Sequence, residues 1–205
     1  MRKKLLYIGS IGLIMTLFLI VFAARCLSDR ESIPRPFTAF DLLIGEDDLP
    51  TYWQVDGTPV SLVTGLGEGD EDDSNVVFIA ADSDAKAAQS IYRTSSRKIA
   101  ESIFDTELPR HFRDRTIIRD SPWQIPDQLS YVSPYTNRQH MACTTYSSLY
   151  ICQYIAQYEE FVTIFSSYID ERVMSLEQFN GVVQHIDERF ARFLDLSPLL
   201  EDSSN

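Results

Sequence analysis

The sequence contains few of the residues on which catalysis and metal binding most often depend. Its 205 residues include only three histidines and three cysteines. His111, His140 and His185 lie far apart in the sequence and none belongs to a paired-histidine metal motif. The sequence also lacks a G-x-S-x-G nucleophile elbow and a phosphate-binding glycine loop. It therefore predicts no catalytic residue, no metal ligand and no cofactor.

An acidic stretch, GEGDEDDSN at residues 67–75, begins like a calcium-binding loop, because Asp70, Asp72 and Ser74 alternate along it. The match then fails, since Asn75 occupies the position of the turn glycine and Ala81 that of the bidentate glutamate. Carboxylates prefer hard cations in general, which leaves weak divalent binding open. We expect a solvated acidic loop here.

Basic residues are scarce outside the amino terminus. Arg2, Lys3 and Lys4 are the only charged residues among the first 24; removing these three from the chain's 18 basic residues leaves 15, against 30 acidic ones, a net charge of −15. Phosphate backbones and anionic lipid head groups repel such a surface. The composition thus argues against a nucleic-acid partner.

Residues 5–24 carry no charge at all. A helix of this length spans the hydrocarbon core of a bilayer, and the basic residues before it should remain in the cytoplasm. We therefore expect residues 1–24 to be a retained single-pass anchor in the cell membrane, with the domain outside the cytoplasm. A cleaved signal peptide and a lipoprotein signal lipidated at Cys26 fit the same compartment, although Arg25 replaces the small residue usual before such a cysteine.

Composition also divides the rest of the chain. Residues 25–36 are polar with two prolines and suit a short stalk. Residues 37–197 carry the apolar patterns of one extracytoplasmic domain, and residues 198–205 end in a polar tail that we expect to be disordered.

Two patterns predict structure in the first half of the domain. Strand-forming residues on both sides of Asp56-Gly57 predict a β-hairpin. A stripe of apolar and small residues with helical spacing from Ala88 to Ile103, after a capping residue near Ser83, predicts one long amphipathic helix.

The second half of the domain has a different texture. Between Leu129 and Ile169, four segments rich in aromatic and β-branched residues are separated by very short connections, which predicts a four-stranded antiparallel meander. Ser175 and Gln178 then form a capping box ahead of a second amphipathic helix. Segregated strands and helices predict an α+β fold, an antiparallel meander sheet packed with two helices.

Two cysteines surround the pair Ser147-Ser148 in the meander. If these serines form a hairpin turn, Cys143 lies opposite Cys152 as a non-hydrogen-bonded pair, whose α-carbons are about 4.5 Å apart. That separation permits a disulfide, and an extracytoplasmic compartment lets one persist. The sequence therefore predicts a cross-strand disulfide with a structural role. Two free cysteines packed as small apolar side chains are the alternative.

The same register divides the meander side chains between two faces of the sheet. One face, called here the aromatic face, includes Tyr150, Tyr154, Phe161 and Phe165. Tyrosine and phenylalanine offer large contact areas, so these four residues form our candidate contact surface for an unknown protein or small molecule. The alternative is that a helix covers this face and the aromatic residues belong to the core.

Two classes of function remain open. The sequence favours a non-enzymatic interaction or sensing module, because no catalytic constellation is visible in it. A hydrolase-like enzyme, whose nucleophile and base meet only in three dimensions, is the alternative. A concave site that joins a hydroxyl or thiol to a histidine or carboxylate would discriminate between them.

Overall fold

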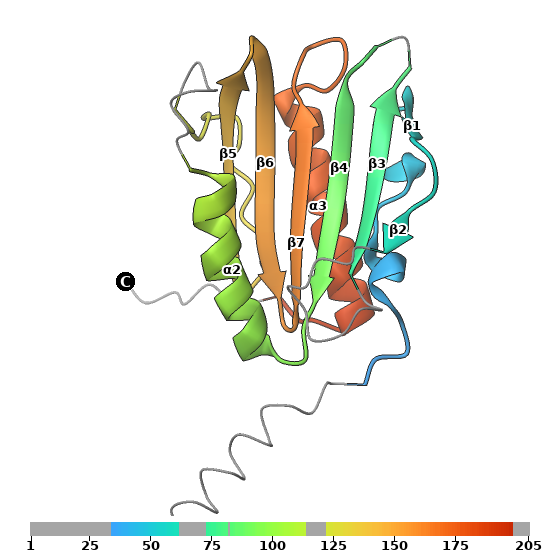
Figure 1. The fold of residues 1–205 in the computed structure, drawn as a ribbon, viewed down its shortest axis with the longest axis vertical. Helices are drawn as coiled ribbons and strands as arrows, with labels where there is room; N and C mark the ends of the chain where they lie inside the picture. The colour runs from blue at the N-terminus through green and yellow to red at the C-terminus, as the bar shows by residue number, and fades with distance from the viewer. Residues whose placement is uncertain (1–33, 62–72, 82, 114–121, 199–205) are drawn as a thin grey trace, which may run out of the picture. The chain divides into compact units, whose positions relative to one another are not determined.

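The computed structural model describes residues 34–61, 73–81, 83–113 and 122–198, which form an α+β domain with one antiparallel sheet and a helix on each face (Figure 1). The predicted α+β class with an antiparallel sheet is confirmed. The predicted anchor, most of the stalk, the first part of the acidic stretch and most of the tail lie outside the described residues. Within the described ranges, no helix has the length and apolarity needed to cross a membrane.

The sheet has seven strands in the order β1-β3-β4-β7-β6-β5, and β2 also pairs with β3. The strands are β1 (Trp53–Val55), β2 (Val60–Ser61), β3 (Ser74–Ala80), β4 (Lys86–Arg93), β5 (Arg138–Tyr146), β6 (Leu149–Tyr158) and β7 (Phe161–Tyr168). Two short 3-10 turns, η1 (Ala39–Leu42) and η2 (Glu46–Asp48), precede them. β5, β6 and β7 form a meander, and β4 joins it by pairing with β7.

The predicted long helix between Ser83 and Ile103 is wrong in its first half. This part of the chain is strand β4, and α2 (Arg97–His111) begins only after it. Side chains of β4 are buried in alternation, which is the period of a strand. Its small and apolar residues matched helical spacing by coincidence. Ser96 caps α2 by accepting a hydrogen bond from the Ile99 N–H.

Two further strand predictions need correction. Gly57 has a positive φ of 88°, as a turn glycine can, but β1 and β2 on either side of it both pair with β3 rather than with each other. The segment Leu129–Tyr135 contains no strand, so the meander has three strands and not four. Pro134 interrupts this segment. The N–H of Ser133 donates to the side chain of Gln139 and not to a neighbouring strand.

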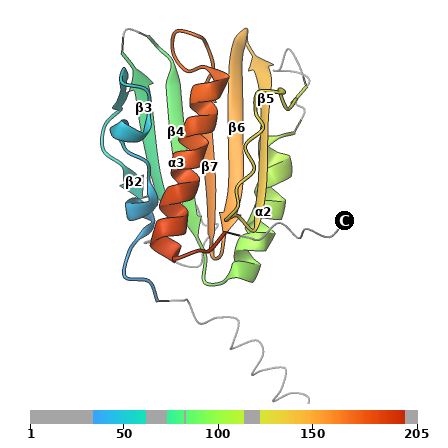
Figure 2. The ribbon, with the colours of Figure 1, turned by 180° about the vertical axis from the view of Figure 1, so that it is seen from behind.

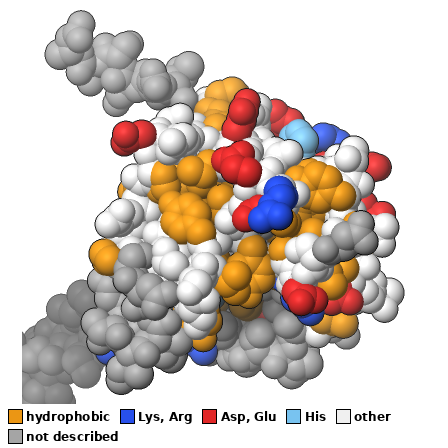
Figure 3. Space-filling model, turned by 90° about the horizontal axis from the view of Figure 1, so that it is seen from above, with side chains coloured by type: hydrophobic (Ala, Val, Ile, Leu, Met, Phe, Trp, Pro, Cys, Tyr) orange, Lys and Arg blue, Asp and Glu red, His pale blue; other side chains and the backbone are white. Residues whose placement is uncertain are grey.

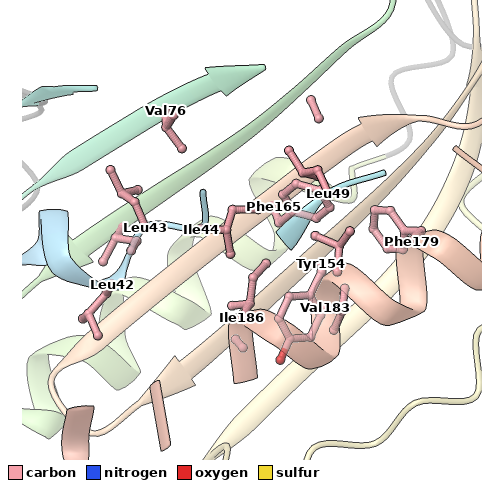
Figure 4. Close-up of a cluster of buried hydrophobic side chains, with 14 of the residues drawn as sticks. Leu42, Leu43, Ile44, Leu49, Val76, Tyr154, Phe165, Phe179, Val183 and Ile186 are labelled. Carbon is pink, nitrogen blue, oxygen red and sulfur yellow. The ribbon is translucent and has the colours of Figure 1, made fainter. Parts of the chain in front are cut away.

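The second predicted helix is confirmed as α3 (Leu176–Leu194), with the capping box of Ser175 and Gln178 formed. It lies across one face of the sheet (Figure 2), and its side chains share a core cluster with Tyr154, Phe161 and Phe165, so this is the aromatic face. Its buried side chains pack against the strands there, as Figure 4 shows for Phe179, Val183 and Ile186 near Tyr154 and Phe165. This contact is the main core of the domain.

α2 covers part of the opposite face. Ala100, Ile103 and Phe104 from the helix pack on Ile155 and Ile164 from the central strands. Both faces of the meander therefore carry a helix. This explains why the side chains that the sequence assigns to either face are not predominantly polar. The predicted register, which divided the side chains between the two faces, agrees with the strand pairing.

Candidate functional site

The pair Ser147-Ser148 forms the turn between β5 and β6. Both serines have positive φ, 47° and 67°, as the two central residues of a type I′ turn require. Cys143 therefore lies opposite Cys152, and the two are joined in a disulfide with 4.0 Å between their α-carbons. The predicted disulfide is present in the structure.

Backbone hydrogen bonds confirm the kind of pair that the cysteines form. The N–H and C=O of Cys143 both bond to Gln124, at 2.7 and 2.8 Å. These groups therefore point away from β6, as they must in a non-hydrogen-bonded pair. Both cysteines are buried, so the disulfide fixes the β5–β6 ribbon from inside the core.

The expected contact surface on the aromatic face is not open in this structure. Tyr154, Phe161 and Phe165 are at most 1% exposed beneath α3 and belong to the core. These three residues therefore do not form an open contact surface in this structure, because the apolar side of the amphipathic helix α3 packs on them. Tyr150 differs from them, since it is only partly buried at the start of β6.

Tyr150 lies instead on the wall of a cleft at one end of the sheet. The cleft has a volume of about 910 Å³. Three loops surround it: the β3–β4 turn, the β5–β6 turn and the β7–α3 loop. In Figure 1 these loops lie together at the top, with the β7–α3 loop between the two hairpins.

The strand order explains why the cleft forms at this place. β7 lies between β4 and β6, and its chain leaves the sheet after Tyr168 to reach α3. The turns that begin β4 and β6 therefore flank the end of β7 without a strand between them. Small residues of the β3–β4 turn, Ala81 and Ala85, line one side and leave the space open.

The walls of the cleft are mostly apolar and its rim is polar. Besides the alanines at 80, 81 and 85, the apolar and aromatic lining residues are Tyr52, Leu149, Tyr150, Tyr168, Ile169 and Val173. The polar lining residues are Ser83, Asp84, Ser148, Asp170 and Arg172. Figure 3, which looks onto this end, shows hydrophobic side chains with acidic and basic ones among them. Such a mixture is typical of small-molecule sites.

Hydrogen bonds hold the β7–α3 loop in place beside the cleft. Asp170 pairs with Met174 in an isolated bridge, and the Ile169 N–H donates to the Tyr150 carbonyl at 2.8 Å. The Trp53 indole N–H donates to the Val173 carbonyl at 3.0 Å. The cleft wall is therefore preformed, so little conformational entropy of the loop is lost when a ligand binds.

The charges at the rim are unequally compensated. Asp170 accepts a hydrogen bond from the Arg172 backbone at 2.9 Å, and its carboxylate lies 3.6 Å from the guanidinium. Asp84 is exposed and forms no hydrogen bond or ion pair with any described residue. Burial raises the pKa of the Tyr150 phenol, so this ring is uncharged at neutral pH.

None of the three histidines is among the described residues that line the cleft. His111 pairs with Glu107 on α2, His140 packs edge-on against Phe112, and His185 lies near Asp48. In the part of the chain that the structure describes, no group of histidine, cysteine and acidic residues could hold a metal ion.

Sequence reasoning missed a buried polar network around Asp187 on α3. The Tyr131 hydroxyl donates to the Asp187 carboxylate at 2.6 Å and the Tyr158 hydroxyl at 2.9 Å, and Ser133 donates to it as well. The Tyr154 and Tyr158 hydroxyls are 3.0 Å apart. Burial raises the pKa of Asp187, while these three hydrogen bonds lower it. The sequence offered one indication of this network, since Asp187 directly follows the apolar Ile186 on the side of the helix that also carries Phe190.

This network fastens the loop before β5 to α3 and has no access to the cleft. Asp187 is not exposed at all, and Ser133 is only 7% exposed. Neither residue lines the cleft. The serine hydroxyl also accepts hydrogen bonds from the backbone of Tyr135 and Thr136. These contacts satisfy buried polar groups, so the network is structural.

Comparison with known proteins identifies no relative. No protein-family model, no curated protein and no solved structure matches this chain.

Proposed function

We propose that this chain is a membrane-anchored, extracytoplasmic binding domain without enzymatic activity, and that the cleft at the β5–β6 turn is its ligand site. The observation that carries the proposal is the preformed cleft of about 910 Å³, with three tyrosines in its lining. This volume lies within the range of small-molecule sites, about 300–1,000 Å³.

The lining favours binding over catalysis. A nucleophilic hydrolase activates a hydroxyl or thiol with a base held at hydrogen-bond distance. Among the described residues that line the cleft there is no histidine, lysine or cysteine. The two carboxylates described there, of Asp84 and Asp170, form no hydrogen bond with a described lining hydroxyl. The Ser83 hydroxyl accepts a hydrogen bond from the Ala85 N–H, as in a local turn.

Two observations support the proposed compartment. The uncharged stretch at residues 5–24 follows three basic residues, which favours a single span with a cytoplasmic amino terminus. The disulfide between Cys143 and Cys152 fits an oxidising environment outside the cytoplasm. The membrane is the first partner that we propose, and the cleft ligand is the second.

The first described residues are held to the sheet by an ion pair. Arg35, near the first described residue, forms a bidentate ion pair with Glu160, at 2.7 and 3.0 Å. Glu160 lies in the β6–β7 turn, at the end of β6 opposite Tyr150.

Accessibility to protease tests the proposed topology. Protease added to intact cells should remove the domain and leave the amino terminus protected. Detection of the domain only after the cells are broken would contradict the extracytoplasmic placement. A mature chain that begins at Ala24, or at a lipidated Cys26, would contradict the retained anchor while leaving the compartment intact.

Ligand-observed NMR with the full-length protein in detergent tests the cleft. A panel of small aromatic probes of mixed charge should contain binders, and Ala81→Trp should abolish their binding by filling the cleft from its rim. Val132→Trp is the matched control, because Val132 is 75% exposed and lies outside the lining. Binding that survives Ala81→Trp would refute the site, and covalent labelling of Ser83 or Ser148 by a fluorophosphonate would favour the hydrolase.

A further inference from the structure

The rim of the cleft carries one carboxylate that the protein does not neutralise. Asp84 is exposed on the β3–β4 turn and has no hydrogen bond or ion pair among the described residues. Arg172, the only basic residue among the described residues of the lining, forms an ion pair with Asp170. These described lining residues carry a net charge of −1, from two aspartates and one arginine. An anionic ligand would meet repulsion here.

The walls offer a second feature that suits a positive charge. Three aromatic rings line the cleft: Tyr52 from the segment before β1, Tyr150 from β6 and Tyr168 from the end of β7. Their hydroxyls form no hydrogen bond with any described residue. A cation over the face of a tyrosine ring is attracted by its quadrupole. A hydroxyl without a partner can accept a hydrogen bond from an ammonium group.

The charge of the whole domain acts in the same direction. Beyond residue 24 the chain has 15 basic and 30 acidic residues. Such an excess attracts cations toward a cleft and repels anions, and the effect weakens as the salt concentration rises. The charge at the rim of the cleft and the charge of the whole domain therefore both favour a positively charged ligand.

We infer that the cleft binds a small organic cation, a molecule with an ammonium group on an apolar or aromatic body. The inference rests on the proposed function and names its ligand class. The ammonium group pairs with Asp84 and contacts the tyrosine faces, and the apolar body lies against Leu149 and Val173. The cleft volume of about 910 Å³ accommodates a small molecule rather than a folded partner.

Three probes of similar shape and different charge test this inference: 2-phenylethylammonium, 2-phenylethanol and 3-phenylpropionate. Each is titrated into the full-length protein in detergent at low salt. The cation should bind about threefold to tenfold more tightly than the neutral alcohol, and the anion more weakly than both. Added salt should reduce the preference for the cation.

Asp84→Asn is the decisive variant. It should remove most of the difference between the cation and the alcohol and leave the affinity for the alcohol unchanged. Asp127→Asn is the matched control, because Asp127 is also exposed but lies outside the lining. An equal loss in both variants would show a general charge effect and overturn the role of Asp84.

The outcomes separate this inference from the proposed function. If the alcohol or the anion binds as tightly as the cation, and Ala81→Trp still abolishes binding, the ligand class is wrong and the cleft remains the site. If Ala81→Trp leaves the binding of all three probes unchanged, the site itself is wrong. Absence of binding by all three probes overturns both.

Discussion

The Tyr158 hydroxyl donates to the Asp187 carboxylate at 2.9 Å and thereby joins β6 to α3 inside the core. The Tyr158 ring also stacks on Phe190 of the same helix, with 4.2 Å between ring centroids. One side chain therefore combines an apolar contact with a hydrogen bond to a buried acid. Buried carboxylates are costly unless hydrogen bonds compensate them, and Asp187 receives three.

Asp187→Ala should destabilise the domain strongly. The substitution removes the acceptor of the buried Ser133 and Tyr158 hydroxyls and of the partly buried Tyr131 hydroxyl. We expect a loss of about 3–5 kcal/mol in the free energy of unfolding. Urea denaturation followed by circular dichroism measures it. Glu188→Ala is the control, because Glu188 is the exposed neighbour on α3 and should change stability little. Equal effects of the two changes would contradict a buried network.

The stability of the domain should also depend on pH through Asp187. Burial raises the pKa of this carboxyl above its ordinary value of 3.8. At a pH between the ordinary pKa and the raised pKa, the folded state therefore holds a proton that the unfolded state has released. The contribution of Asp187 to stability is thus present at low pH and is lost as the pH rises through the folded-state pKa. Wild type should lose stability relative to Asp187→Asn across that interval. A difference independent of pH would contradict the raised pKa.

Short-range patterns made part of this fold predictable. The turn at Ser147-Ser148, the register that pairs Cys143 with Cys152, and the capping box of α3 all depend on residues close together in sequence. Local turn geometry and side-chain periodicity determine such features. The same periodicity misled the prediction where β4 imitated a helix, because small residues such as Ala88 fit both periods.

Long-range pairing decided the rest. The cleft exists because β4 pairs with β7, for example Ala87 with Ser167, and no local pattern announces a contact between strands so distant in sequence. Tyr131 and Asp187 likewise meet across 56 positions. Tyr150 lines the cleft, but its neighbours there come from three other segments, so the sequence around Tyr150 could not indicate the cleft.

Loss of the disulfide should destabilise the domain without unfolding it. The bond closes a loop of sequence separation 9, so its removal in the Cys143→Ala/Cys152→Ala double variant should cost about 2–3 kcal/mol. Thermal denaturation measures the loss. Peptide mapping without reductant should recover the two cysteines as one linked pair. Free thiols in protein alkylated before lysis would show that the bond does not form in the cell.

The ion pair between Arg35 and Glu160 should show strong coupling. Glu160 is buried, with 1% of its side chain exposed, whereas Arg35 is 20% exposed. Arg35→Met leaves the carboxylate buried and uncompensated, and we expect a loss of about 3 kcal/mol. The double variant Arg35→Met/Glu160→Met removes both charges and should be more stable than Arg35→Met alone. Additive losses in the two single variants would contradict a coupled pair.

Serine substitutions at Tyr150 and Tyr154 should separate the cleft from the core. The two tyrosines have the same parity on β6, but Tyr154 is 1% exposed beneath α3 and Tyr150 lines the cleft. Tyr154→Ser leaves a cavity and removes a partner of the Tyr158 hydroxyl, so it should cost about 3–5 kcal/mol. Tyr150→Ser removes a partly exposed ring and should cost about 1 kcal/mol.

Binding should respond in the opposite order. Tyr150→Ser should remain folded and lose affinity for the aromatic probes, because it deletes part of the cleft wall. Tyr154→Ser, measured at a temperature where it is still folded, should retain the affinity, since its ring does not reach the cleft. Equal losses of stability in the two variants would place Tyr150 in the core with Tyr154. The ligand site would then have to be sought among the loop residues of the cleft alone.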